Sequence, residues 1–175
     1  DHVGKAPSRF DLKKLENLNG HYIREADDKR LAELISPKLG AGSGRKELLV
    51  RAMPELKARA HNLNQLADGA AFLFAVRPIT IEPGAADLLN GDGRSLLARA
   101  HAALAQLTDW EHDALDAAVR NVAEEAGVKL GKLAQPLRAA LTGKTTSPGI
   151  FDVLVLLGRD ESLARIADQS ERAEA

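Results

Sequence analysis

The sequence contains no cysteine. This absence excludes disulfide bridges, thiolate catalysis and cysteine-based metal sites, and it fits a reducing cytoplasm. Aromatic residues are scarce, with one Trp, one Tyr and four Phe among 175 residues. No apolar run approaches the roughly 18 residues that a membrane-spanning helix needs. We therefore expect a cytoplasmic location and no membrane partner.

The chain also has no large excess of either charge. It contains 24 basic and 25 acidic residues, and the formal net charge is −1. Overall charge gives no reason to expect a nucleic-acid partner, so any such prediction must rest on a local patch. The first residues, "DHVGKAPSRFD", include no initiator Met and no signal-peptide pattern. We expect the chain to be a fragment of a longer protein.

The abundant residues favour helices. Apolar residues make up 45% of the chain, mainly Leu and Ala, which are the strongest helix formers. The segment "VRPITIEPGA" at 76–85 has two prolines and only a short β-branched run, which is typical of a boundary. The sequence predicts an all-α fold with two helical subdomains, at 1–76 and 81–175.

A search for catalytic and metal-binding patterns returns none. The histidines never stand at a zinc-like spacing with a partner, and no serine lies in a nucleophile elbow. We therefore predict no catalytic residue, no metal site and no cofactor site in this chain. The histidines are His2, His21, His61, His101 and His112.

The stretch "KLGKLAQPLRAALTGKTTSPG" at 129–149 has four basic residues and no acidic one. We predict a short helix that begins at Pro136, where its free N–H groups and positive dipole end favour phosphate oxygens. Arg138 falls in the first turn, and a guanidinium can donate to a base edge or stack on it. Lys129, Lys132 and Lys144 are candidate phosphate contacts. The alternative is an ordinary solvated face.

Four segments resemble the C-terminal anticodon-binding region of bacterial glutamyl-tRNA synthetases, which are class I aminoacyl-tRNA synthetases. The segments are "FDLKKLENLNGHYIR", "GVKLGKLAQPLRAALTG", "SPGIFDVLVLLG" and "ESLARI". The resemblance covers nearly the whole chain in order. It implies that 1–76 is a helical cage and that 81–175 is the C-terminal anticodon-binding subdomain.

The catalytic half of the family is missing, since neither a His-x-Gly-His signature nor a Lys-Met-Ser-Lys-Ser-like loop is present. The resemblance implies a parent enzyme that attaches glutamate to tRNA(Glu), with ATP and Mg in the absent catalytic domain. We expect this fragment alone to be inactive and monomeric. Its expected partners are the anticodon loop of tRNA(Glu) and the catalytic domain of the parent chain.

The resemblance also assigns roles to individual residues. Arg59 matches the arginine used at the third anticodon base, where glutamate and glutamine tRNAs differ. Arg138 matches the arginine at the first anticodon positions, and Ser147 matches a loop hydroxyl beside it. Secondary positions that line the same pocket are matched by Arg120, Gln135 and Ile150.

Four of these assignments have a structural alternative. Arg59 is otherwise a plain surface arginine, Arg138 a partner in an intradomain salt bridge, Ser147 a turn former before Pro148, and Gln135 a helix cap. A different class of function also stays open. The near-neutral charge and the acidic end of the chain favour a helical protein-interaction scaffold that does not read RNA.

Overall fold

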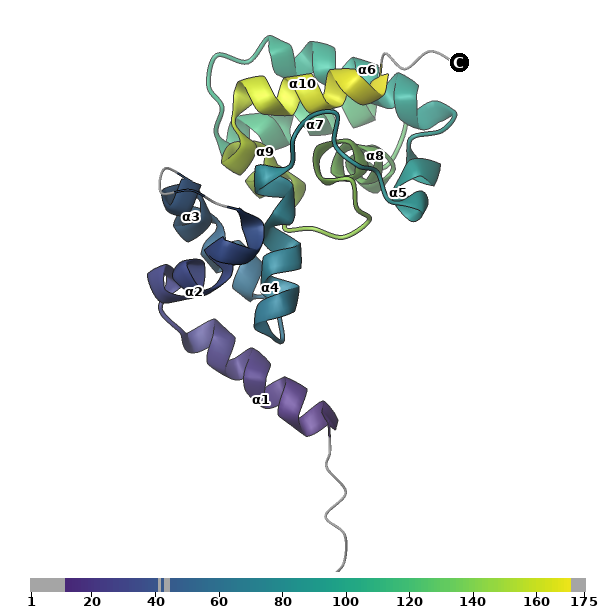
Figure 1. Ribbon diagram of the computed structural model, residues 1–175. Helices are drawn as coiled ribbons and strands as arrows, with labels where there is room; N and C mark the ends of the chain where they lie inside the picture. Colours follow the sequence, from purple (N-terminus) through teal and green to yellow (C-terminus); the bar gives the residue numbers. More distant parts are fainter. Residues whose placement is uncertain (1–11, 41, 43–44, 171–175) are drawn as a thin grey trace, which may run out of the picture.

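The computed structural model describes residues 12–40, 42 and 45–170 (Figure 1). Every regular element in these ranges is helical, which confirms the predicted all-α fold. Two short 3₁₀ helices, η1 (Ser36–Leu39) and η3 (Ala71–Phe74), accompany the α-helices. The α-helices are α1 (Leu12–Glu25), α2 (Asp28–Ile35), α3 (Lys46–Lys57), α4 (Leu63–Ala70), α5 (Pro83–Leu88), α6 (Asp92–Ala105), α7 (His112–Glu125), α8 (Leu130–Thr142), α9 (Ile150–Leu157) and α10 (Arg159–Ser170).

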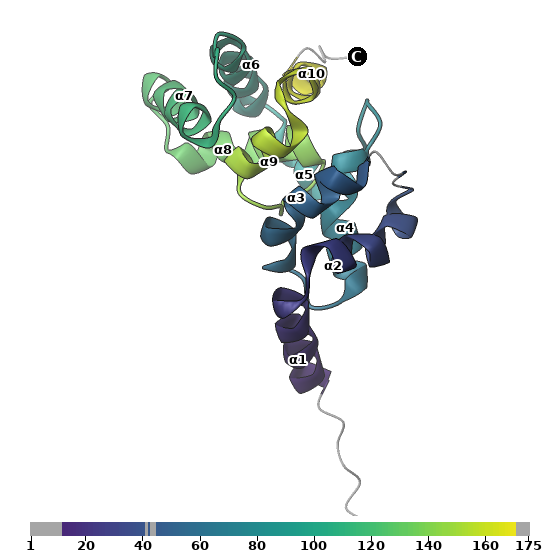
Figure 2. The same cartoon turned by 90° about the vertical axis from the view of Figure 1, so that its left-hand side faces the viewer.

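The first helix group runs from α1 to η3. Helices α2, α3 and α4 pack on one another, and they bury Ile35, Leu49, Met53 and Leu66 between them. Helix α1 extends away from this group, as Figures 1 and 2 both show. Ile23 near its C-terminal end is buried, so α1 is attached to the group by one end.

The second helix group comprises α5 to α10, and α8 lies at its centre. Helix α8 packs against α5, α6, α7, α9 and α10. Its inward face is formed by Leu133, Leu137 and Leu141, which are spaced four residues apart and are fully buried. Because α8 is held on so many sides, the backbone from which its side chains project has a fixed position.

The prediction that a short helix begins at Pro136 is wrong. Helix α8 begins at Leu130 and runs through Pro136, although an interior proline loses a hydrogen bond and crowds the preceding turn. The leucine stripe continues on both sides of the proline, and burial of each leucine stabilises the helix by about 1.5 to 3 kcal/mol. Pro136 is itself buried and lies against α6 at Gly93. The free N–H groups of α8 therefore lie at Leu130, two turns before Arg138.

The two groups are joined by residues 75–82 and by packing of α3 against α9. In the joining segment, the Glu82 backbone N–H donates to the Gly143 carbonyl at 2.8 Å. Gly143 ends α8 with a φ of 74°. No helix in the part of the chain that the structure describes is both long and apolar enough to cross a membrane.

Candidate functional site

A pocket of about 370 Å³ opens between the two helix groups. One wall comes from the end of α3, from α4 and from η3, and the other comes from the end of α8 and the loop at 143–149. In both Figure 1 and Figure 2 this loop lies beside the first helix group. The lining residues of the first wall are Leu56, Arg59, Gln65, Asp68, Gly69 and Phe72, and those of the second are Thr142, Lys144, Thr146, Ser147 and Pro148.

Arg59 lies just beyond the C-terminal end of α3. Its backbone N–H donates to the Leu56 carbonyl at 3.2 Å, which tightens the end of the helix and directs the chain into α4. The Arg59 side chain is exposed and lines the pocket. Among the residues that the structure describes, no carboxylate lies within ion-pair distance of its guanidinium, although Asp68 lines the same pocket.

Arg138 lies on α8, on the side of the second wall, and is half-buried. It is not itself a lining residue of the pocket, but it contacts the lining residue Ser147. Its Nε donates to Ser147 Oγ at 2.9 Å. The same Oγ donates to the Pro148 carbonyl at 2.7 Å. Because the Ser147 hydroxyl accepts one hydrogen bond and donates another, its rotation is fixed. Ser147 therefore orients the Arg138 guanidinium and is more than a turn former.

The two arginines influence each other. Burial lowers the pKa of the Arg138 guanidinium, and the positive charge of Arg59 lowers this pKa further. Arginine nevertheless stays protonated in proteins. Within the described ranges Arg138 has no ion-pair partner, so an intradomain salt bridge does not explain it. Two like charges that lie close to each other favour a ligand with negative charge or hydrogen-bond acceptors.

Lys132 and Lys144, two of the three lysine candidates, have acidic partners outside the acid-free stretch. Lys132 Nζ lies 3.3 Å from a carboxylate oxygen of Asp92. Lys144 Nζ lies 3.7 Å from a carboxylate oxygen of Glu82 and donates to the Asp68 carbonyl at 3.4 Å. Lys129 stands exposed at the N-cap of α8. Solvent-exposed ion pairs are weak, so Lys132 and Lys144 are not held firmly by these partners.

The structure does not place the three secondary candidates in the lining of this pocket. Arg120 is exposed on α7 and forms an ion pair with Asp116 on its own helix at 2.7 Å. Gln135 lines a separate pocket of about 350 Å³ beside Lys132, and it does not cap a helix because α8 begins five residues earlier. Ile150 starts α9 and is only 5% exposed, because it packs into the core.

Some lining residues were not foreseen. Gln65, Asp68 and Phe72 follow Arg59 on α4 and η3, and Thr146 precedes Ser147. The segment that carries Gln65, Asp68 and Phe72 has the sequence pattern of an ordinary amphipathic helix. The only local signal was the run of polar residues in "HNLNQLADG" directly after Arg59.

Comparisons with known proteins find relatives that all belong to one family. Residues 30–169 match the family model of the anticodon binding domain. Glutamate–tRNA ligase 2 of Rhizorhabdus wittichii is 61% identical over 173 residues, which cover 95% of this chain and 36% of that protein. Glutamate–tRNA ligase 1 of Erythrobacter litoralis is 58% identical over 172 residues, which cover 98% of this chain and 36% of that protein.

A solved structure shares the fold. The glutamate tRNA ligase of Elizabethkingia meningosepticum, crystallised with its amino acid, superposes with a TM-score of 0.76 at 20% identity. The match covers 93% of this chain and 32% of that chain. The chain thus spans about a third of the length of these relatives.

Proposed function

Because the chain belongs to the anticodon binding domain family, we propose that it reads the anticodon loop of tRNA(Glu) as part of a glutamate–tRNA ligase. The observation that carries this proposal is that Arg59 lines the pocket from one helix group, while Arg138 is held from the other group by its hydrogen bond to the lining residue Ser147. The two guanidinium groups are close enough for the charge of Arg59 to lower the pKa of Arg138. Both guanidinium groups lack an ion-pair partner in the described part of the chain. Proteins recognise single-stranded RNA loops by splaying out bases, which stack on guanidinium planes and form hydrogen bonds along their edges.

Each candidate residue then has a role. Arg59 donates to the edge of the third anticodon base, which is C in glutamate tRNAs. Arg138, oriented by Ser147, binds the first anticodon positions. Lys129, Lys132 and Lys144 contact phosphates. The two helix groups act as subdomains, 1–76 and 81–175, whose shared pocket receives the unstacked bases.

The remaining chemistry is proposed for the part of the relatives that this chain does not match. Activation of glutamate with ATP and Mg would take place there, so the chain alone would be inactive. In this proposal its partners are the tRNA and the catalytic domain of the same protein, in a monomeric enzyme of the cytoplasm.

A salt titration tests the proposed function. Binding of a tRNA(Glu) anticodon hairpin to the full-length protein should weaken steeply with salt, with a log–log slope of about −0.7 for each phosphate contacted. Affinity can be measured by fluorescence anisotropy between about 50 and 200 mM salt. A helical protein-interaction scaffold would bind the hairpin weakly or not at all, and that result would exclude RNA reading.

Ser147→Ala tests the orientation of Arg138. The variant removes the acceptor of the Arg138 Nε hydrogen bond, which contributes about 1 kcal/mol, so hairpin affinity should fall about fivefold. The salt slope should not change because no phosphate contact is lost. Ser95→Ala, an exposed serine on α6 outside the pocket, is the matched control. If both variants bind the hairpin with equal affinity, Ser147 does not contribute to RNA binding.

A further inference from the structure

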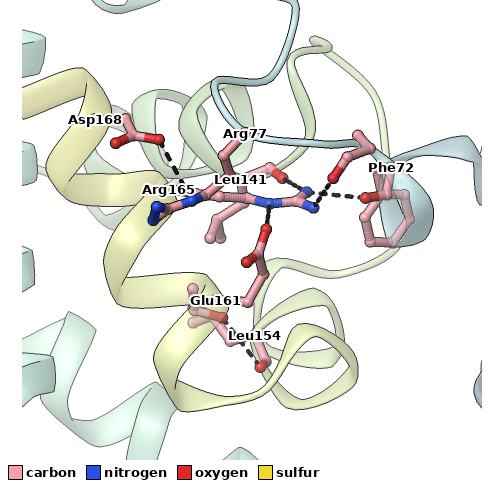
Figure 3. Close-up of polar contacts among 9 residues, drawn as sticks. Phe72, Arg77, Leu141, Leu154, Glu161, Arg165 and Asp168 are labelled. Carbon is pink, nitrogen blue, oxygen red and sulfur yellow. Dashed lines mark hydrogen bonds and ion pairs between the residues drawn. The ribbon is translucent and has the colours of Figure 1, made fainter.

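Arg165 of α10 is the largest fully buried polar side chain in the described part of the chain, with 1% of its surface exposed. Figure 3 shows its side chain reaching toward the carbonyl oxygens of two distant segments. Nη1 donates to the carbonyls of Phe72 at 2.9 Å and Leu141 at 2.7 Å. Nη2 donates to the Ala75 carbonyl at 3.1 Å, and Nε donates to Glu161 at 2.6 Å.

These carbonyls need a donor from outside their own helices. Phe72 lies in η3, and Leu141 lies in the last turn of α8. The last carbonyls of a helix have no partner within the helix and carry its negative dipole end. A buried carbonyl without a donor costs free energy. One guanidinium satisfies the carbonyls of both helix ends and of the segment that joins the two groups.

The same two helix ends form the walls of the pocket described above. Phe72 lines the first wall, which also carries Arg59. Leu141 directly precedes Thr142, which lines the second wall, and it follows Arg138 by less than one helical turn on α8. Because a single nitrogen atom binds both carbonyls, the spacing between the walls is fixed at this point.

We propose that Arg165 is a positioning residue, which sets the spacing of the two pocket walls and hence the placement of Arg59 relative to Arg138. This inference rests on the proposed function. Lysine cannot replace arginine in this role, because an ammonium is a point charge without the rigid planar arrangement of donors. Arg165 touches no ligand in this scheme and acts through the walls alone.

Arg165→Lys in the full-length protein is the first test. The KM for tRNA(Glu) should rise about tenfold, as is typical for coupling through a packed network. The preference for C over G at the third anticodon position should fall, because Arg59 is displaced. The kcat at saturating tRNA and the salt slope should stay within about twofold of the wild type, since no phosphate contact is lost.

Glu161→Gln is a milder second variant. It keeps an oxygen acceptor for Arg165 Nε but removes the negative charge at position 161. Charge-assisted hydrogen bonds are about twice as strong as neutral ones, so the KM should rise about threefold. Arg77→Gln is the matched control. It breaks a neighbouring, partly exposed ion pair with Asp168 at 3.8 Å and should leave the KM and the base preference unchanged.

The outcomes separate the two proposals. A folded Arg165→Lys variant with wild-type KM and base preference overturns the positioning role. If Arg165→Lys does not fold, wild-type values for Glu161→Gln overturn it instead. A wild-type protein that shows no preference between hairpins carrying C and G overturns the proposed function itself, and the positioning role with it.

Discussion

Replacing Arg59 with Gln is expected to reduce the preference for C over G at the third anticodon base by about tenfold to a hundredfold. The reason is the loss of a charge-assisted hydrogen bond, which contributes about 1.5 to 3 kcal/mol. The fold should be unaffected, because the Arg59 side chain is exposed and has no ion-pair partner in the described part of the chain. The measurement is the ratio of kcat/KM for tRNA(Glu) and for a variant carrying G at that position.

Arg51→Gln provides the control for this experiment. Arg51 is also exposed, and it lies on α3 close to Arg59 in sequence, but it lines a different pocket between α2 and α3. The two variants lose the same charge, so a general electrostatic effect would change both equally. If Arg59→Gln discriminates as well as the wild type, Arg59 does not read the third base.

Gly143→Ala is expected to lower the free energy of unfolding by about 2 to 5 kcal/mol. Gly143 has a φ of 74°, which L-residues rarely adopt, and a Cβ at this position would lie 2.1 Å from the Thr80 carbonyl oxygen. The backbone would have to move, and the hydrogen bond from the Glu82 N–H to the Gly143 carbonyl would be lost. Urea unfolding of the variant and the wild type gives the difference.

Gly127→Ala separates backbone strain from the close contact. Gly127 has a similar φ of 66°, but a Cβ there would meet no atom within 4 Å. Its replacement should therefore cost only the strain of the left-handed conformation, about 1 to 2 kcal/mol. If both variants lose the same free energy of unfolding, the backbone at Thr80 can move away from residue 143 at little cost.

The helical class could be predicted because its cause is local. Leu115, Val119 and Val122 recur on one face of α7, and the structure buries all three. Pro136 shows where local rules fail. Its effect on a helix is unfavourable by itself, and only the burial of residues on both sides, against elements distant in sequence, explains why α8 continues through it.

The candidate site could be predicted in part. The acid-free stretch by itself indicated Arg138, whereas only the resemblance paired it with Arg59. Arg59 and Arg138 are 79 positions apart in the numbering, and no periodicity links them. The partner of Lys132 is likewise 40 residues away, so the acid-free stretch gave no sign of it. Arg165 was missed because arginine is usually exposed. The buried face of α10 consists of Ser162, Arg165, Ile166 and Gln169, with a single apolar residue among them.

The position of Arg165 in the chain has a consequence for biosynthesis. Arg165 is synthesised 93 residues after Phe72 and 24 residues after Leu141. At about 5 to 20 residues per second, a ribosome needs about 5 to 19 s to travel from Phe72 to Arg165. During this interval the nascent first wall is without its guanidinium donor, and water must hydrate the Phe72 carbonyl. The pocket can therefore reach its final dimensions only late in translation, after α10 has left the exit tunnel.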